Sequence, residues 1–97
     1  MGKTYFVSRH EGAVLWAKEK QLNIDFFLDH LNPDIIQEGD TVIGSLPMAL
    51  AAEICRKKAH FFALSIKTTK EQRGKELSAS ELNKCECMIE EFKVERV

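Results

Sequence analysis

Three side chains able to bind a phosphate and move a proton stand together near the start of the sequence, at Ser8, Arg9 and His10. Serine offers a hydroxyl, arginine binds phosphate oxygens through paired N–H donors, and histidine exchanges a proton near pH 7. They lie between an apolar segment typical of a buried strand and a segment of good helix formers. Because helix N-termini favour anions, this position predicts a phosphate site. The alternative is that Ser8 caps the helix while Arg9 and His10 face solvent.

A second loop with similar properties contains Gly44, Ser45, Leu46 and Pro47. Glycine allows close approach of a ligand to the backbone, and the serine adds a second hydroxyl at a helix start. The glycine could equally serve strand packing alone. The sequence lacks both the GxxxxGK[ST] and the GxGxxG patterns, which argues against a triphosphate or dinucleotide cradle.

A third loop, polar and long, runs from Lys67 to Leu77 and contains Arg73, Gly74 and Glu76. Long polar connections are often functional lids, so Arg73 is expected to supply a second cation over the ligand. Hydroxyls, arginines and a histidine without a carboxylate pair suit phosphate recognition better than glycoside chemistry.

These loops need one edge of a sheet, and the hydrophobic pattern predicts such an edge. Short apolar segments predict strands at Thr4–Ser8, Ile24–Leu28, Thr41–Gly44 and His60–Ile66. A first helix is predicted over Ala13–Lys20. A second is predicted to follow a Ser45 cap, with Pro47 in its first turn. A third is predicted after a Ser78–Glu81 capping box, with Leu82, Cys85, Ile89 and Phe92 on one side. The alternation predicts a three-layer α/β domain with a mostly parallel four-stranded sheet flanked by helices. Right-handed crossovers then bring the loops to the carboxyl edge, where ligands bind.

Length and composition limit the function further. A chain of 97 residues fits one domain, residues 1–97, and favours a homodimer where a large binding surface is needed. Its 14 basic and 15 acidic residues nearly cancel, which argues against a duplex DNA binder. The sequence has no apolar run of ~20 residues and no signal peptide, so no membrane is expected and the expected location is cytoplasmic.

The cysteines and the remaining histidines do not indicate a metal site. Cys55, Cys85 and Cys87 form an odd set without a framework spacing, and His30 and His60 stand apart from ligand-spaced cysteines or carboxylates. We therefore expect neither a metal nor another cofactor.

Four motifs extend this interpretation: TYFVSRHEGA at 4–13, DHLNP at 29–33, GDTVIGSLP at 39–47 and RGKELS at 73–78. In content, order and spacing they resemble the Csx-sixteen family of small CRISPR-associated ancillary proteins, encoded beside type III CRISPR systems. The resemblance spans essentially the whole chain. It implies a Rossmann-like domain related to the CARF (CRISPR-associated Rossmann-like) domains, which bind cyclic oligoadenylates as homodimers.

The resemblance also implies an activity, that of a ring nuclease that linearises cyclic tetra-adenylate and switches off the antiviral signal. The expected reaction is a metal-independent attack by the ribose 2′-hydroxyl that leaves a 2′,3′-cyclic phosphate. We expect Arg9 to hold phosphate oxygens, His10 to transfer a proton, Ser8 to position the ligand and Arg73 to close over it. The expected ligand-binding residues are Gly12, Gly44, Ser45, Leu46, Pro47, Lys67, Gly74 and Glu76.

Two alternatives remain open from the sequence. A protein with the same loops could sequester cyclic oligoadenylate without cutting it. An unrelated α/β domain could bind another small molecule or a partner, with the first loop merely starting a helix.

Overall fold

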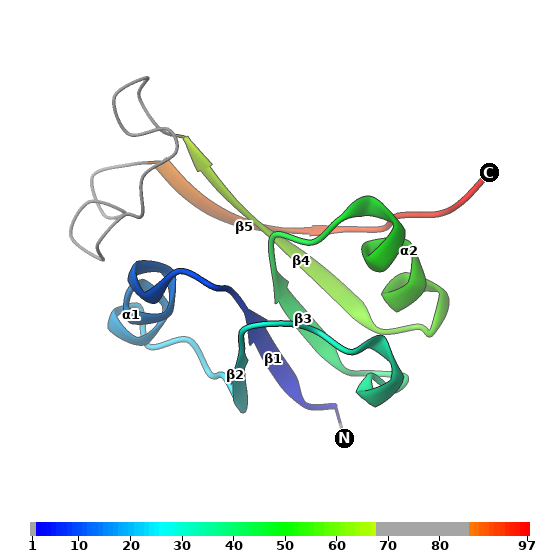
Figure 1. Cartoon of the computed structure of the whole chain (residues 1–97), viewed down its shortest axis with the longest axis horizontal. Coiled ribbons are helices and arrows are strands. Elements are labelled where there is room, and N and C mark those ends of the chain that lie inside the picture. Colours follow the sequence, from blue (N-terminus) through cyan, green and yellow to red (C-terminus); the bar gives the residue numbers. More distant parts are fainter. Residues whose placement is uncertain (1, 68–85) are drawn as a thin grey trace.

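The computed structural model describes residues 2–67 and 86–97, and its elements alternate as strand and helix until the last two strands (Figure 1). Their bounds, in chain order, are β1 Thr4–Val7, α1 Glu11–Glu19, β2 Phe26–Leu28, the 3₁₀ helix η1 Pro33–Ile35, β3 Thr41–Gly44, α2 Met48–Arg56, β4 His60–Lys67 and β5 Glu86–Phe92.

The strands form one sheet in the order β2-β1-β3-β4-β5. β1 pairs in parallel with both β2 and β3, and β3 pairs in parallel with β4. The fifth strand, β5, pairs antiparallel with β4. The predicted α/β architecture with a mostly parallel sheet is confirmed, whereas the predicted number of four strands is wrong because β5 extends the sheet.

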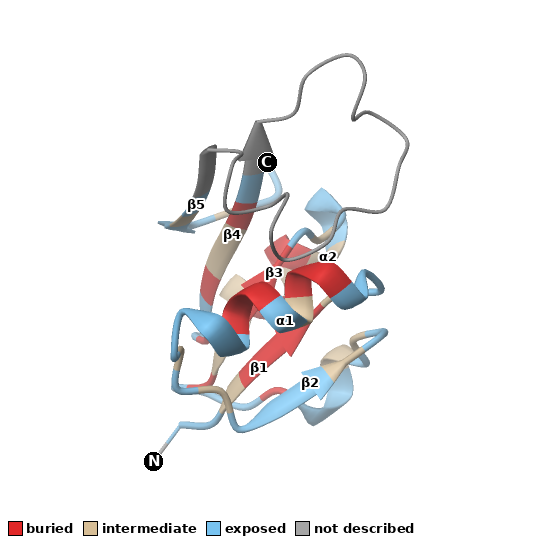
Figure 2. Cartoon of the chain, turned by 90° about the vertical axis from the view of Figure 1, so that its left-hand side faces the viewer, coloured by how far each residue is buried: buried red, intermediate tan, exposed pale blue. Residues whose placement is uncertain are grey.

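Helices cover both faces of this sheet. Figure 2 looks onto α1, whose buried side faces the strands. The buried residues on the α1 face are Phe6, Ala13, Trp16, Ala17, Ile43 and Leu64. On the opposite face, α2 and the segment around η1 bury Tyr5, Val7, Ile36, Val42, Ala51, Ile54, Ala59 and Phe61. Since β1 leads outward to β2 and β3 leads the other way to β4, right-handed crossovers place α1 and α2 on opposite faces.

The last helix predicted from the sequence is a strand over residues 86–92. Ile89 and Phe92 lie in β5, while Ser78, Glu81, Leu82 and Cys85 lie outside the described residues. β5 satisfies the free backbone edge of β4, pairing Ile89 with Leu64. Ile89 is partly buried against the α1 side of the core, whereas Met88 and Glu90 on either side are exposed, an alternation typical of a strand.

The start of α2 also differs from the prediction. Ser45 does not occupy the N-cap position, which belongs to Pro47, and α2 begins at Met48. The Ser45 Oγ donates a hydrogen bond to the carbonyl oxygen of Leu64 on β4, at 2.9 Å. The serine therefore ties the second loop to the neighbouring strand instead of capping the helix.

Two carboxylates accept backbone hydrogen bonds at the edge of the sheet where the parallel strands begin. Asp40, the one charged residue that is buried in the described part of the chain, accepts the N–H of Lys3 and the N–H of Gln37, each at 2.9 Å. Asp25 accepts the N–H of Thr4 at 2.7 Å. The carbonyl of Asp40 also accepts the N–H of His60 at 2.8 Å, so one residue joins the starts of β1, β3 and β4.

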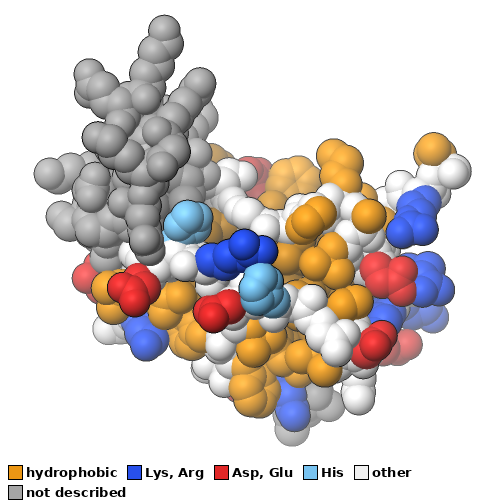
Figure 3. All heavy atoms as spheres, viewed as in Figure 1, with side chains coloured by type: hydrophobic (Ala, Val, Ile, Leu, Met, Phe, Trp, Pro, Cys, Tyr) orange, Lys and Arg blue, Asp and Glu red, His pale blue; other side chains and the backbone are white. Residues whose placement is uncertain are grey.

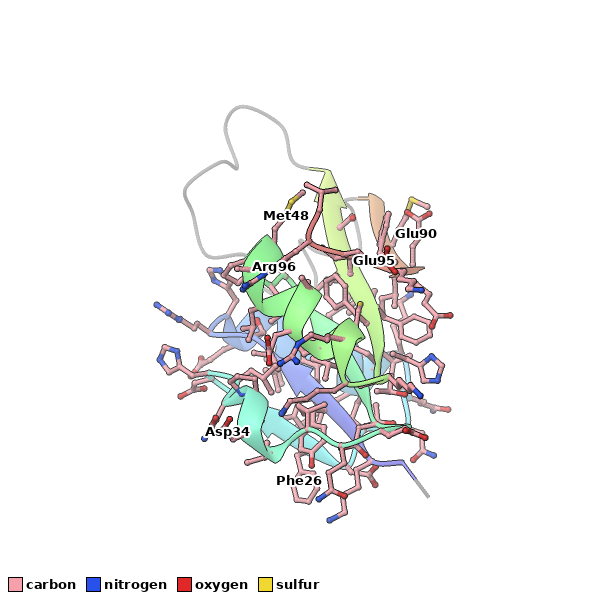
Figure 4. The ribbon with its side chains drawn as sticks, turned by 90° about the vertical axis from the view of Figure 1, so that its right-hand side faces the viewer. Phe26, Asp34, Met48, Glu90, Glu95 and Arg96 are labelled. Carbon is pink, nitrogen blue, oxygen red and sulfur yellow. The ribbon has the colours of Figure 1, made fainter. Side chains whose placement is uncertain are left out.

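The segment after β5 crosses α2, where Glu95 and Arg96 are labelled in Figure 4. Val94 is partly buried against the α2 side of the core, and its N–H donates to the Sγ of Cys55 at 3.4 Å. In the described residues, no helix has the length and apolar character needed to cross a membrane.

Candidate functional site

The carboxyl ends of β1 and β3 meet in the middle of the sheet, where Val7 is paired with Gly44. The chain turns to opposite faces after these two strands, and ligands of open α/β sheets bind at such a point. A cavity of about 590 Å³ lies here. Its lining residues are Val7, Ser8, Arg9, His10, Ala13, Asp29, His30, Leu31, Ser45, Leu46, Pro47, Leu50 and Leu64.

The first loop is ordered by backbone and hydroxyl bonds. The N–H of Ser8 donates to the carbonyl oxygen of Leu28 at 2.9 Å, and the Ser8 Oγ accepts the N–H of His10 at 3.1 Å. His10, not Ser8, is the N-cap residue of α1, and its carbonyl oxygen accepts the N–H groups of Ala13 and Val14. The alternative in which Ser8 caps the helix is therefore wrong. Because the Ser8 oxygen accepts the bond within the loop, its hydroxyl proton can be donated to a ligand.

Arg9 and His10 are exposed side chains at the mouth of this cavity, and the structure adds two residues to them. The Nη2 of Arg9 lies 3.4 Å from the Nδ1 of His30, and Asp29 lines the same cavity. Both added residues follow β2, whose carboxyl end lies beside that of β1. Neither was among the site residues expected from the sequence.

A signal for His30 was nevertheless present in the sequence. Asp29 and His30 belong to one of the four shared motifs, and they directly follow a predicted strand. In a parallel sheet every strand brings its following loop to the carboxyl edge. The loop after β2 leads into the short η1 and not into an α-helix, so the rule of strand-to-helix loops does not mark it.

The second loop contributes Ser45, Leu46 and Pro47 to the cavity, as expected, but Gly44 has a different role. Gly44 is buried at the end of β3, and a Cβ built on it would collide with the carbonyl oxygen of Val7. Glycine is thus required for the contact between the ends of β1 and β3. This contact supports the strand-packing interpretation of the residue.

The cavity has a charged side and an apolar side. Figure 3 shows two histidine side chains on either side of a basic side chain, an acidic side chain close by, and apolar side chains next to them. Among the residues that line the cavity, the ionisable side chains are Arg9, His10, Asp29 and His30. The apolar side consists of Leu31, Leu46, Pro47, Leu50 and Leu64. Such a surface can hold an anionic group and a flat apolar group next to each other.

Among the expected site residues whose side chains the structure describes, Gly12 and Gly44 do not line this cavity. Gly12 is buried within the first turn of α1. Lys67 is the last residue of β4. Arg73, Gly74 and Glu76 lie outside the described residues.

A further cavity, of about 410 Å³, lies between α2 and the segment after β5. Two of its three cations are paired with carboxylates, since Arg56 bonds Glu53 and the Lys93 Nζ lies 2.9 Å from the Glu95 Oε1; the third is Arg96. The bond from Arg56 lowers the pKa of Glu53, and the bond to Glu95 raises the pKa of Lys93. Arg9 contacts an imidazole instead, which makes its cavity the better anion site.

Within residues 2–67 and 86–97, no three histidine, cysteine or acidic side chains come together in a group that could hold a metal ion. The cavity offers hydroxyl, guanidinium, imidazole and carboxylate groups.

Comparison with known proteins gives one match. Residues 5–95 match the Cas_VVA1548 family, whose description reads "Putative CRISPR-associated protein". No curated protein and no solved structure matches the chain.

Proposed function

Since the chain belongs to the Cas_VVA1548 family of CRISPR-associated proteins, we propose that it is a ring nuclease that binds and linearises a cyclic oligoadenylate, with cyclic tetra-adenylate the expected ring. Cleavage of this second messenger switches off type III CRISPR signalling. We also propose that the domain is a Rossmann-like domain of the CARF type and that the protein is located in the cytoplasm.

The observation that carries the proposal is the arrangement of Ser8, Arg9, His10 and His30 around one cavity at the carboxyl edge of the sheet. Arginine binds the oxygens of a phosphodiester, and the N-terminal end of α1 favours the same anion. The adjoining leucines and Pro47 offer an apolar surface of the kind on which an adenine ring can lie. Phosphate and base thus each have a matching side of the cavity.

The proposed reaction uses the 2′-hydroxyl of the ribose as an internal nucleophile and needs no metal. Its oxygen attacks the adjacent phosphorus, the bond from phosphorus to the 5′-oxygen breaks, and the products end in a 2′,3′-cyclic phosphate and a 5′-hydroxyl. Arg9 holds the phosphate oxygens, His10 moves a proton and the Ser8 hydroxyl fixes the phosphate. Alignment of the three reacting atoms can contribute about 7–11 kcal/mol to lowering the barrier.

A symmetric ring fits a two-fold protein axis, so we propose a homodimer with one Ser8-Arg9-His10 loop from each chain facing alternate phosphates. We expect sedimentation with bound ring to give about twice the 11.1 kDa mass of the chain. A complex that sediments as a monomer with bound ring would contradict this arrangement.

The proposed activity is tested by incubating the full chain with cyclic tetra-adenylate and separating the products by chromatography. We expect linear oligoadenylates with 2′,3′-cyclic phosphate ends, formed at the same rate with and without EDTA. Recovery of the intact ring from a stable complex would contradict cleavage and show that the protein sequesters the ring. Calorimetry that shows no heat with rings of any size would support the unrelated α/β domain instead.

A further inference from the structure

We propose that His30 is the proton donor to the leaving 5′-oxygen, acting as the partner of His10. This inference rests on the proposed ring nuclease function and names the second half of its acid–base chemistry. Cleavage by a 2′-hydroxyl has two proton transfers, one away from the attacking oxygen and one to the departing oxygen. A single histidine cannot serve both at once when they lie on opposite sides of phosphorus.

The backbone holds His30 near the first loop. Leu28 is paired with Val7, and the N–H of Ser8 donates to the carbonyl oxygen of Leu28 at 2.9 Å. His30 follows two residues after this bond and lines the same cavity as His10. The two histidines therefore come from different strand ends that are hydrogen bonded to each other.

Arg9 and both histidines line one cavity, and Arg9 contacts one of the two imidazoles. The Nη2 of Arg9 lies 3.4 Å from the Nδ1 of His30, so a phosphate held by Arg9 lies within reach of His30 as well. In the proposed complex, a phosphodiester bound at Arg9 has one imidazole on the side of attack and the other on the side of departure.

The charges around the two histidines suggest which one donates. Asp29 precedes His30 and lines the same cavity, so it adds an acidic group beside this histidine in the sequence. His10 is the N-cap residue of α1, so its ring lies at the positive end of the helix dipole. Arg9 precedes His10 in the sequence and contacts His30, and Glu11 lines a further pocket together with Arg9 and His10. In the balanced step His10 takes the 2′-hydroxyl proton, His30 gives a proton to the 5′-oxygen, and water restores both rings.

A substrate with sulfur in place of the bridging 5′-oxygen tests this role, because a thiolate leaves without a proton. We expect His30→Ala to slow cleavage of the ordinary cyclic tetra-adenylate by about 100- to 10,000-fold. We expect the same variant to cleave the sulfur-bridged ring at nearly the wild-type rate, while His10→Ala remains slow on both rings. The control is His60→Ala, whose histidine lies at the start of β4 with its Nδ1 2.7 Å from Glu91, and we expect wild-type rates on both rings.

A binding measurement separates proton transfer from a positioning role through Arg9. With the uncleavable 2′-deoxy ring, His30→Ala should bind with nearly wild-type affinity. An equal loss on both cleavable rings, or a rate on the ordinary ring equal to wild type, would overturn the role of His30. Failure of the wild-type protein to cleave either ring would instead overturn the proposed function, so the two failures are distinguishable.

Discussion

In the proposed reaction, we expect replacement of His10 by alanine to lower the rate of cyclic tetra-adenylate cleavage by about 100- to 10,000-fold, the usual effect of removing a general acid or base. His10 is exposed at the N-cap of α1 and lines the cavity beside Arg9. Its ring is therefore free to meet a ligand, and its backbone carbonyl, which accepts the N–H groups of Ala13 and Val14, is kept in the variant. Single-turnover rates at saturating protein measure the effect.

Affinity and stability separate this loss from a damaged fold. We expect His10→Ala to bind the 2′-deoxy ring with nearly wild-type affinity and to melt at the wild-type temperature, because the exposed side chain takes no part in the core. His60→Ala again provides the matched histidine control outside the cavity. Cleavage by His10→Ala at the wild-type rate would remove the proton-transfer role of this residue.

Replacing Asp40 by alanine lowers the free energy of unfolding by about 2–4 kcal/mol, since the N–H groups of Lys3 and Gln37 lose their acceptor. For a domain of this size that corresponds to a melting temperature lower by at least about 8 °C. Asp40 is only 6% exposed, so water cannot fully replace the carboxylate. Thermal unfolding followed by circular dichroism measures the change.

The matched control for this prediction is Glu38→Ala, an exposed acidic residue two positions earlier in the same turn. We expect its melting temperature to stay close to wild type. Because Asp40 lies at the amino edge of the sheet, Asp40→Ala should keep wild-type cleavage wherever it is folded. An unchanged melting temperature for Asp40→Ala would show that its two hydrogen bonds contribute little to stability.

The parallel part of the fold could be predicted from the sequence because its strands are short, continuously apolar and separated by clear helix formers. β1 and β3 carry such runs at residues 4–7 and 41–44, and the structure confirms both. Their loops were placed at one edge by the handedness of the crossovers, and Ser8, Arg9, His10, Ser45, Leu46 and Pro47 do line one cavity.

The end of the chain could not be predicted in the same way. Ile89 and Phe92 stand three residues apart and fit one face of a helix, yet the segment ECMIEEF also fits a strand with Ile89 turned inward. This segment forms a strand because it pairs with the free edge of β4, which is distant in the sequence and exists only in the folded sheet. Local pattern carries no information about such a pairing partner.

The role of Gly44 and the approach of His30 to Arg9 depend on tertiary geometry for a related reason. A glycine at a strand end is compatible with a nearby ligand or a nearby backbone, and only the position of Val7 decides between them. Likewise, His30 reaches Arg9 because β2 lies beside β1 in the strand order. Periodicity along the chain does not fix that order.

The main-chain contact of Gly44 with Val7 has an energetic consequence for any ligand of this cavity. The two loops begin where their backbones already touch, so little loop entropy is lost when a ligand bridges Ser8 and Ser45. What a ligand still has to immobilise is the exposed side chain of Arg9 and the two imidazoles. For the proposed cyclic ligand this means that a ring of the wrong size would meet a fixed spacing between the two loops.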